Sequence, residues 1–495
     1  MRDYLKRLVT AGFAYQAGDI LSKGVAIFTL PLYTSYVSPD GYGYAETLLT
    51  AVILLSILLR LGVGEAFIRF YYDDADPERR DRTAATAVVF VLATTTVAAL
   101  AGVALAGPLS RALLGRRDAG LFDLAMLGIL AFTNLEIAYA LLRADERTGT
   151  YMRASIVNVV VTIGLTAFLV VGRRAGAEGL LGGNYSASAA VLVGLWWRER
   201  RRLRAGLAGR DLGLWRMLVF GLPTVPADAS VYALQVADRW YLLRAQTAAA
   251  AGLYALAAKL ATVVFVAVRG FQYAWPPLAY SVEDDAIAAR LYSVVTTYYV
   301  LATGAVVAGV ALLGRWAVRL LLHHNYYGAH LALPWLALGW ALYGLYLIFV
   351  VISGRARRTR RNLPAALGGL VVNVVGLIVL VPAFGIAGAG AALVIAYVAM
   401  IAVIHWLTRE LFTVGFEVAR LARLIVVLAG VSVAGEMLLP THGLAGFLLR
   451  ALAWCAIWPL LWASGFFRGD EIAQARALAA RVRAASRRGP HRERG

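Results

Sequence analysis

Seven charged side chains stand inside long apolar stretches of the sequence. The basic ones are Lys23, Arg60, Lys259 and Arg269, and the acidic ones are Asp19, Glu65 and Asp228. A charge at bilayer depth costs about 2.5–3.5 kcal/mol on insertion scales, so such a side chain faces a protein interior or a water-filled cavity. Arginine binds phosphate oxygens in bidentate geometry, and lysine adds a compact positive charge. The four cations therefore predict a site for a phosphate-bearing anion.

Two of the cations lie at similar depth in different parts of the chain. Arg60 stands about seventeen residues into one apolar stretch and Arg269 about twenty residues into another. We expect these two arginines to bind one diphosphate from opposite sides. The further binding residues predicted are Lys23 and Lys259, and the candidates for coupling to a proton or a sodium ion are Asp19, Asp228 and Glu65.

Pairing within a helix is an alternative use of some of these charges. Asp19 and Lys23 are four residues apart, as are Glu65 and Arg69, and this spacing allows salt bridges on one helix face. For Lys23 this alternative stays open. Arg60 and Arg269 have no acidic residue three or four positions away.

The composition requires a membrane as solvent for most of the chain. Hydrophobic residues make up 60% of the 495 residues and charged residues 16%, and the mean hydropathy is +0.69, whereas a soluble domain has about 45–50% and 25%. Apolar runs longer than 18 residues exclude a transmembrane barrel, whose strands are about 9–11 residues long. The single cysteine, Cys455, excludes an internal disulfide, and no cluster has metal-ligand spacing. We predict an all-α polytopic membrane protein without a bound metal or cofactor.

The pattern of apolar runs predicts about fourteen transmembrane helices joined by short loops. Their approximate ranges are 10–37, 43–70, 84–108, 119–142, 154–172, 176–197, 216–241, 249–280, 291–313, 331–353, 363–383, 386–407, 420–439 and 443–466. With the N-terminus in the cytoplasm, 33 basic residues fall in cytoplasmic loops and tails and 8 on the other side. This bias predicts that both termini are cytoplasmic. The local exceptions are Arg111, Arg116, Arg117, Arg173 and Arg174.

An internal repeat relates the first six segments to the next six. Gly41–Leu49 matches Ala251–Leu260 at an offset of 210, and Asn158 and Asn373 each precede a helix that begins with G-x-x-G. Six helices restore the same orientation, so the two halves should be related by an axis along the membrane normal. The predicted parts are an N-terminal lobe over 1–215, a second lobe over 216–410, an extra helix pair over 411–466 and a basic tail over 467–495.

Several motifs in this order resemble one known family. They are Leu30–Leu48 (LPLYTSYVSPDGYGYAETL), Phe220–Ser230 (FGLPTVPADAS), Asp238-Arg239 and Phe271–Ser281 (FQYAWPPLAYS). Together they are similar to the oligosaccharide flippases, or polysaccharide biosynthesis transporters, of the multidrug/oligosaccharidyl-lipid/polysaccharide (MOP) superfamily. The resemblance covers the first twelve segments.

The resemblance implies a transporter and not an enzyme. It implies two six-helix lobes that move a polyprenyl-diphosphate-linked oligosaccharide from the inner to the outer leaflet by alternating access, for cell-surface polysaccharide synthesis. It also implies pathway partners such as glycosyltransferases or a polymerase. Arginine outnumbers lysine by 45 to three, which is typical of a GC-rich bacterial genome, so we expect a bacterial inner membrane location. Fourteen helices also suit the related lipid II flippases, in which an added helix pair helps to form a groove for the lipid tail.

Two further functions remain as alternatives to weigh. A cation-coupled multidrug exporter of the same fold would favour acids and aromatic residues over four cations in its cleft. A membrane glycosyltransferase would need acidic catalytic residues at a membrane face and usually a sizeable outer loop, whereas the loops here are short. The charges therefore favour transport of an anionic lipid-linked substrate.

The charge bias leads to a test of topology. A reporter enzyme that is active only outside the cytoplasm, fused after Gly495, should be inactive in cells that make full-length fusion protein. A cytoplasmic reporter at the same position should be active. Strong activity of the external reporter would overturn the orientation.

Overall fold

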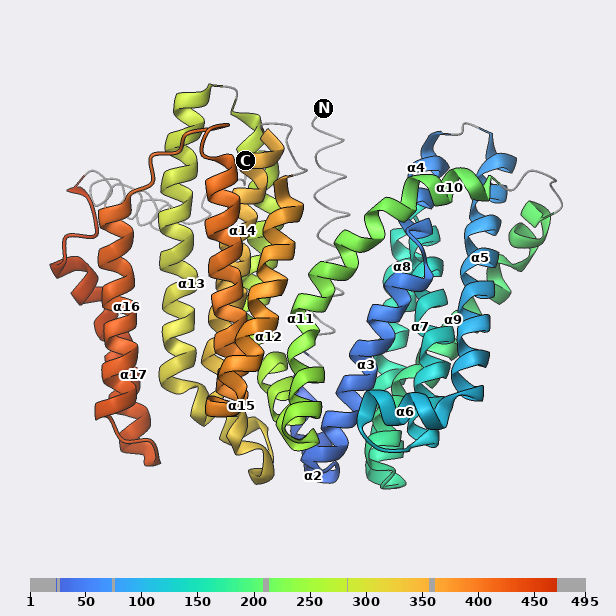
Figure 1. Cartoon of the computed structure of the whole chain (residues 1–495), viewed down its shortest axis with the longest axis horizontal. Helices are drawn as coiled ribbons and strands as arrows, with labels where there is room; N and C mark the ends of the chain where they lie inside the picture. The colour runs from blue at the N-terminus through green and yellow to red at the C-terminus, as the bar shows by residue number, and fades with distance from the viewer. Residues whose placement is uncertain are drawn as a thin grey trace, which may run out of the picture.

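The molecule is helical throughout the part of the chain that is described. The computed structural model describes residues 24, 27–73, 76–207, 213–282, 284–355 and 361–469, and these ranges contain no strand (Figure 1). The predicted all-α class is confirmed. Asp19, Lys23 and the tail from residue 470 lie outside these residues.

The first half of the chain forms one group of helices. Its elements are α2 (Leu30–Tyr36), α3 (Pro39–Leu59), α4 (Val63–Asp73), α5 (Pro77–Ala104), α6 (Ala106–Leu114), α7 (Ala119–Ala144), α8 (Thr148–Ala167), the π-helical turn η1 (Phe168–Gly172) and α9 (Gly176–Leu207). Helices α5, α7 and α9 pack against one another, and α3 packs on α7.

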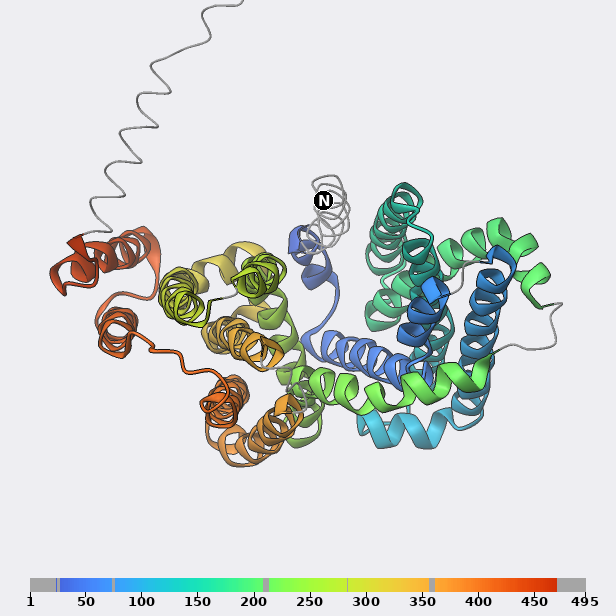
Figure 2. The ribbon, with the colours of Figure 1, turned by 90° about the horizontal axis from the view of Figure 1, so that it is seen from above.

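The second half forms another group. Its elements are α10 (Leu214–Gly221), the 3₁₀ turn η2 (Leu222–Thr224), α11 (Val225–Ala245), α12 (Ala248–Ser281), α13 (Asp285–Leu321), the 3₁₀ segment η3 (His324–Leu331), α14 (Leu333–Arg355), α15 (Asn362–Thr408), α16 (Val418–Leu438) and α17 (Gly443–Ala463). Helix α14 packs against α12, α13 and α15, while α16 and α17 pack on α13. Figures 1 and 2 show the two groups side by side. They meet at the end where α2 lies and stand apart at the other end, except that α10 lies on α4 of the first group (Figure 1).

Ten of the described helices are long and apolar enough to cross a membrane, or eleven if the bent pair of α10 and α11 forms one span. Two predicted segments, 363–383 and 386–407, lie within α15, which is broken at Gly385. The sixth predicted segment is α9, and the first lies mostly outside the described residues. A count of fourteen is compatible with this arrangement and stays a prediction.

Side-chain caps set where several helices begin. Ser38 accepts a hydrogen bond from the Gly41 amide at the start of α3, and Thr247 does the same for Ala250 at the start of α12. Asp76 and Asp284 cap α5 and α13 in the same way. A capping oxygen satisfies one of the amides that a helix start leaves without a partner.

The starts of α3 and α12 cross each other in a reciprocal contact between glycines. A Cβ on Gly43 would overlap the carbonyl of Ala248, and a Cβ on Gly252 would overlap the carbonyl of Pro39. Gly43 and Gly252 are 209 residues apart, and so are the two residues whose carbonyls they face, Pro39 and Ala248. A contact in which each half uses the same two positions is the pattern of a two-fold interface. The repeat therefore has a register of 209, one residue less than the sequence comparison indicated. In this register Arg269 corresponds to Arg60, and Asp228 to Asp19.

The two G-x-x-G motifs form equivalent turns. Gly176 and Gly385, the first glycines, have φ of 53° and 56°, a left-handed conformation that only glycine adopts without strain. The second glycines, Gly179 and Gly388, touch the backbone of the preceding helical segment, near Val170 and at Leu380 respectively. The same local geometry in both halves supports the predicted repeat.

Replacing Gly388 by alanine should destabilise the fold. Its Cβ would overlap the Leu380 carbonyl, which belongs to rigid backbone, so we expect a loss of about 1–3 kcal/mol, as for other overpacked sites. Thermal unfolding in detergent measures the change.

The matched control is Gly368→Ala in the same helix, where a Cβ would meet open space. It should leave the melting temperature unchanged or raise it. Equal stability of Gly388→Ala and the original protein would contradict the assigned contact.

Candidate functional site

A break between α3 and α4 places Arg60. Helix α3 ends at Leu59, Arg60 is its C-terminal cap, and Leu61 and Gly62 have φ of 46° and 72° before α4 begins. Arg60 is half-buried, and its Nε donates a hydrogen bond to the Ser56 carbonyl at 3.2 Å. Irregular backbone at membrane depth is tolerated where it is buried in protein or lines a cavity.

A second break, between α10 and α11, touches the first one. Pro223 lies in the turn η2, and the flanking helices are bent by 43°. A Cβ on Gly62 would overlap the Gly221 carbonyl, and a Cβ on Gly221 would overlap that of Gly62. Only two glycines allow the two backbones to lie this close.

This contact brings an acid of the second half near Arg60. Asp228 lies in the first turn of α11 and is exposed, and the positive charge of Arg60 acts on its carboxylate. The sequence predicted both residues but not their proximity. Glu65, the other described ion-coupling candidate, is exposed in the first turn of α4.

Arg269 occupies the position on α12 that corresponds to Arg60 on α3. It is half-buried, and its guanidinium carbon lies 4.9 Å from the centroid of the Phe265 ring. Each arginine follows its crossing glycine, Gly252 or Gly43, by seventeen residues, which is about 25 Å along a helix. The two arginines therefore lie at equivalent depth in the two halves. Among the contacts of the described residues there is none that joins Arg60 directly to Arg269.

Lys259 has a carboxylate partner from the other half. Its Nζ donates to the carboxylate of Glu46 and, at 2.7 Å, to the hydroxyl of Tyr42. The Glu46 side chain is 8% exposed and that of Lys259 36%. The ion pair joins α3 to α12, so Lys259 contributes to contact between the halves. Sequence reasoning missed Glu46 because its partner is 213 positions away.

Other contacts join the halves at the same end of the molecule. The Tyr326 hydroxyl donates to the Val37 carbonyl at 2.7 Å, the His323 amide to the Thr34 hydroxyl at 3.2 Å and the Ala249 amide to the Asp40 carboxylate at 2.9 Å. We call this end, with α2, α6 and η3, the closed side. The opposite end, with α4 and α10, is called the open side (Figure 1).

A buried carboxylate in the second half is a further polar site that the charge survey missed. Asp238 of α11 is fully buried and accepts a hydrogen bond from the Tyr254 hydroxyl. The side-chain amide of the buried Asn373 lies close enough to interact with this carboxylate, and no other side chain of the described residues contacts its Oδ1 by a hydrogen bond. In the sequence Asp238 stood out only as part of a family motif, and nothing there indicated that it is a buried polar site. A buried carboxylate can bind a proton or a small cation.

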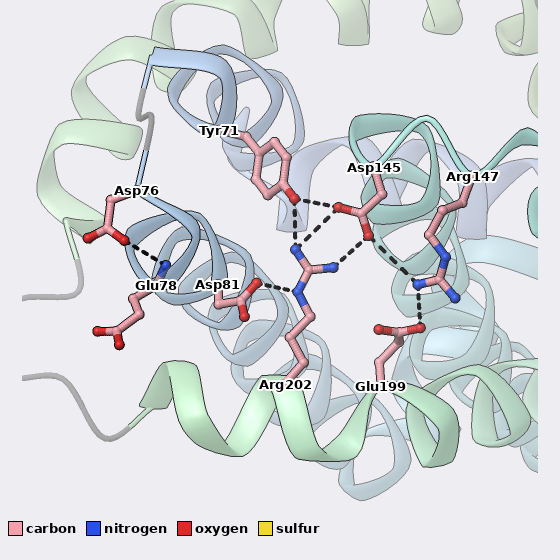
Figure 3. A network of polar contacts seen from close by, with 8 residues as sticks. All are labelled: Tyr71, Asp76, Glu78, Asp81, Asp145, Arg147, Glu199 and Arg202. Atoms are coloured by element: carbon pink, nitrogen blue, oxygen red, sulfur yellow. Dashed lines mark hydrogen bonds and ion pairs between the residues drawn. The ribbon is translucent and has the colours of Figure 1, made fainter.

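A polar network fixes the open side of the first half (Figure 3). Arg202 of α9 binds Asp81, Asp145 and the Tyr71 hydroxyl, the last at 2.7 Å. Burial lowers the pKa of Arg202, but the carboxylates of Asp145 and Asp81 raise it by a larger amount, so the net shift is upward. Burial, followed by the hydrogen bond to Asp145, raises the pKa of Tyr71. The network therefore keeps Arg202 positively charged at neutral pH, and it ties α4 to α5, α7 and α9.

An apolar groove of about 850 Å³ opens among α13, α14, α15 and α16. Leu338, Val394, Ile425 and Leu428 are among its lining residues. Helix α16 belongs to the predicted extra pair and forms one wall. A groove of this volume and chemistry is large enough for a long hydrocarbon chain.

Comparison with known proteins adds three findings. Residues 8–278 match the family model described as polysaccharide biosynthesis protein. A structure of the lipid II flippase MurJ in an inward closed conformation has a TM-score of 0.68 at 13% identity, covering 93% of this chain and 99% of that one. No curated protein sequence matches the chain.

Multidrug resistance transporters of the MATE family in the MOP superfamily share the fold as well. An inward-facing structure has a TM-score of 0.62 at 15% identity and covers 80% of this chain and 94% of that one. An outward-facing structure has a TM-score of 0.57 at 16% identity, with coverage of 82% and 94%. These likenesses show the fold.

The ion pair of Lys259 and Glu46 leads to a double-mutant test. Glu46→Gln or Lys259→Met alone should destabilise the protein, because each leaves one charge without its partner. The loss should be below the roughly 3–5 kcal/mol of a fully buried pair, since water reaches Lys259. The double variant Glu46→Gln, Lys259→Met should be more stable than either single variant, because it leaves no charge without a partner. Thermal unfolding in detergent gives all three values.

Glu78→Gln is the control, because Glu78 forms an exposed pair with Arg82 on one helix, a contact worth about 0.3–0.5 kcal/mol. Additive effects of the two single changes at Glu46 and Lys259 would show that the pair contributes nothing.

Proposed function

The chain belongs to the polysaccharide biosynthesis protein family, and on that premise we propose that it is a flippase for a polyprenyl-diphosphate-linked oligosaccharide. The lipid-linked sugar moves from the inner to the outer leaflet by alternating access and serves cell-surface polysaccharide synthesis. The observation that carries the proposal is the equivalence of Arg60 and Arg269 in the 209-residue register of the two halves.

Two equivalent arginines suit a substrate with two phosphates. The diphosphate is anionic and has to leave water, so its charge must be matched inside the protein. A guanidinium offers planar, bidentate hydrogen bonding to phosphate oxygens. One arginine in each half gives the substrate contact with both halves as they move.

Asp228 supplies the competition that release requires. A substrate held tightly in both conformations would be trapped, so a second anion must take over the arginine. Asp228 is near enough to Arg60 for their charges to interact. Asp19 corresponds to Asp228 in the same register, and we propose that it serves Arg269 in the same way, with Lys23 as a further cation of that segment.

Lys259 binds substrate only after its pair with Glu46 opens. In the present conformation Glu46 and Tyr42 engage its ammonium group. Opening of the closed side would separate α3 from α12 and free Lys259 for the arriving diphosphate. The cation thus acts first as a lock between the halves and then as a substrate ligand.

The apolar groove beside α16 is the proposed place for the polyprenyl tail. It is lined almost wholly by hydrocarbon and lies between membrane-spanning helices. The tail can stay in this apolar surrounding while the charged head group enters between the halves, so neither part of the lipid meets an unfavourable solvent.

A proton or a sodium ion is the proposed coupling ion. Asp19, Asp228 and Glu65 are candidates from the sequence, and the buried Asp238 joins them. Neutralising such a carboxylate removes its attraction for an arginine and so changes the competition with phosphate. No cofactor is proposed.

A lipid II flippase is the second candidate within the fold. The similarity to MurJ extends over 93% of the chain, and lipid II also carries a polyprenyl diphosphate, so the same arginines would serve. A cation-coupled multidrug exporter fits the cationic residues less well, because its substrates carry the same sign of charge.

We propose a bacterial inner membrane location with both termini in the cytoplasm, so that the open side faces the cytoplasm. Glycosyltransferases that build the sugar chain and a polymerase that extends it are the proposed pathway partners.

Arg60→Ala or Arg269→Ala should lower flipping at least about tenfold, because each removes charge-assisted hydrogen bonds worth about 1.5–3 kcal/mol apiece. Arg→Lys should retain part of the rate. Asp228→Asn should keep substrate binding and slow turnover. A liposome assay with a labelled polyprenyl-diphosphate oligosaccharide measures the rates.

Arg153→Ala is the control, because Arg153 is exposed and its Nε donates to a carbonyl of its own helix. It should flip at the original rate. Full activity of the Arg60→Ala, Arg269→Ala double variant at equal abundance in the membrane would eliminate the diphosphate site.

A further inference from the structure

A second apolar groove lies on the other half of the molecule, on the closed side. Its volume is about 490 Å³, and its walls come from α3, α5, α6 and α7 together with Trp240 of α11. Leu55, Leu105 and Leu109 line it and are exposed to 39%, 52% and 39%, while Trp240 is exposed to 49%. Large apolar side chains exposed on membrane-spanning helices face lipid, so the groove opens toward the hydrocarbon of the bilayer.

Helix α6 covers the end of this groove and has two chemically different faces. Leu109, Ala112 and Leu113 line the groove. Arg111 is two positions beyond Leu109 and therefore lies on another face of the same helix, and it is exposed. A short helix with an apolar face toward lipid and arginine on its polar face is typical of the membrane interface.

Arg244 lies beside helix α6, which lines the groove. It follows Trp240 by one helical turn, so both lie on the same face of α11. Its Nη1 donates to the Arg111 carbonyl at 3.3 Å, at the C-terminal end of α6. This is one of the five N–H donors of the guanidinium. Within the described residues neither Arg111 nor Arg244 forms an ion pair.

These arginines also run against the charge bias of the chain, as Arg173 and Arg174 do elsewhere on the same side. Only 8 basic residues lie in the loops of this side, against 33 on the other. Arg111, Arg116, Arg117 and Arg244 gather around α6 and the end of α11, and Asp118 neutralises Arg116. Positive charge concentrated beside an apolar groove at the interface attracts anionic head groups.

We propose that this groove binds one anionic glycerophospholipid of the leaflet on the closed side. The phosphate binds Arg244 within the field of Arg111, and an acyl chain occupies the groove against Leu55, Leu105 and Trp240. The smaller volume, about 490 against 850 Å³, favours an acyl chain over a polyprenyl tail. The inference rests on the membrane location and the groove, and not on the proposed transport of an oligosaccharide lipid.

The bound lipid would hold the two halves together on the closed side. The groove has most of its walls on the first half, whereas Trp240 and Arg244 belong to α11 of the second half, which packs on α12 and α15 and also crosses to α3 of the first half. Separation of the halves at this end would pull Arg244 away from α6. The lipid therefore favours the present conformation over one that is open on this side.

Native mass spectrometry of the full-length protein, released from nanodiscs of phosphatidylcholine with one-fifth phosphatidylglycerol, tests the proposal. The original protein should retain one phosphatidylglycerol. Arg111→Gln, Arg244→Gln should lower the retained fraction about tenfold or more, since each arginine near the surface contributes to head-group attraction. Ala101→Trp, which fills the groove without changing charge, should lower it as well.

Arg173→Gln, Arg174→Gln is the control, because it removes two exposed charges from the same side away from the groove. It should retain the lipid. If the double arginine variant loses the lipid and Ala101→Trp retains it, surface electrostatics alone explains the binding, and the proposed groove site is wrong. Retention in both variants, or a polyprenyl diphosphate as the retained molecule, would overturn it too. Lipid retention does not depend on transport of an oligosaccharide lipid. A protein that retains phosphatidylglycerol but fails in the flipping assay would therefore contradict the proposed function and leave the lipid site standing.

Discussion

The structure depends on one backbone contact, where α3 and α12 cross. Gly43 and Gly252 lie so close to the facing carbonyls that a methyl group on either would overlap them. Because the contact is reciprocal, it sets the register of 209 residues between the halves, and that register gives Arg60 and Arg269 equivalent positions. Glu46 and Lys259 meet nearby because the same two helices are held together. The ion pair, the paired arginines and the closed side all follow from the approach of two helices at glycine.

The membrane explains how the remaining charges are arranged. Lys259 has a carboxylate, Arg60 has Asp228 within electrostatic range, and Arg202 has two carboxylates at the open side. Each of these three cations is thus matched by a negative charge, as the cost of burying a charge requires. Within the described residues, Asp238 is the buried carboxylate whose Oδ1 accepts no hydrogen bond by the usual geometric limits. The matched charges stabilise the present conformation.

Much of the fold could be predicted because its signals are local. Long apolar runs indicate helices, and the two G-x-x-G motifs indicate equivalent turns, which Gly176 and Gly385 confirm through their left-handed backbone. The offset of 210 that the match of Gly41–Leu49 with Ala251–Leu260 indicated was one residue too large, because matching side chains do not reveal which backbones touch. Glu46 was missed for a related reason. Its partner is in the other half of the chain, and no spacing within one helix displays a pair that only the tertiary fold creates.

The packing of α10 has a consequence for how the two halves are joined. The sequence repeat puts the boundary near residue 215, yet α10 lies on α4, and its Met217 is buried among apolar residues of the first half. The part of the chain that connects the two groups of helices is therefore η2, between Gly221 and Val225, and not the polar stretch before α10. If the protein were expressed as two pieces divided before α10, the second piece would carry a helix whose binding surface is on the first. The two pieces would then interlock, as in a domain-swapped pair, and each would need the other to bury its apolar surface.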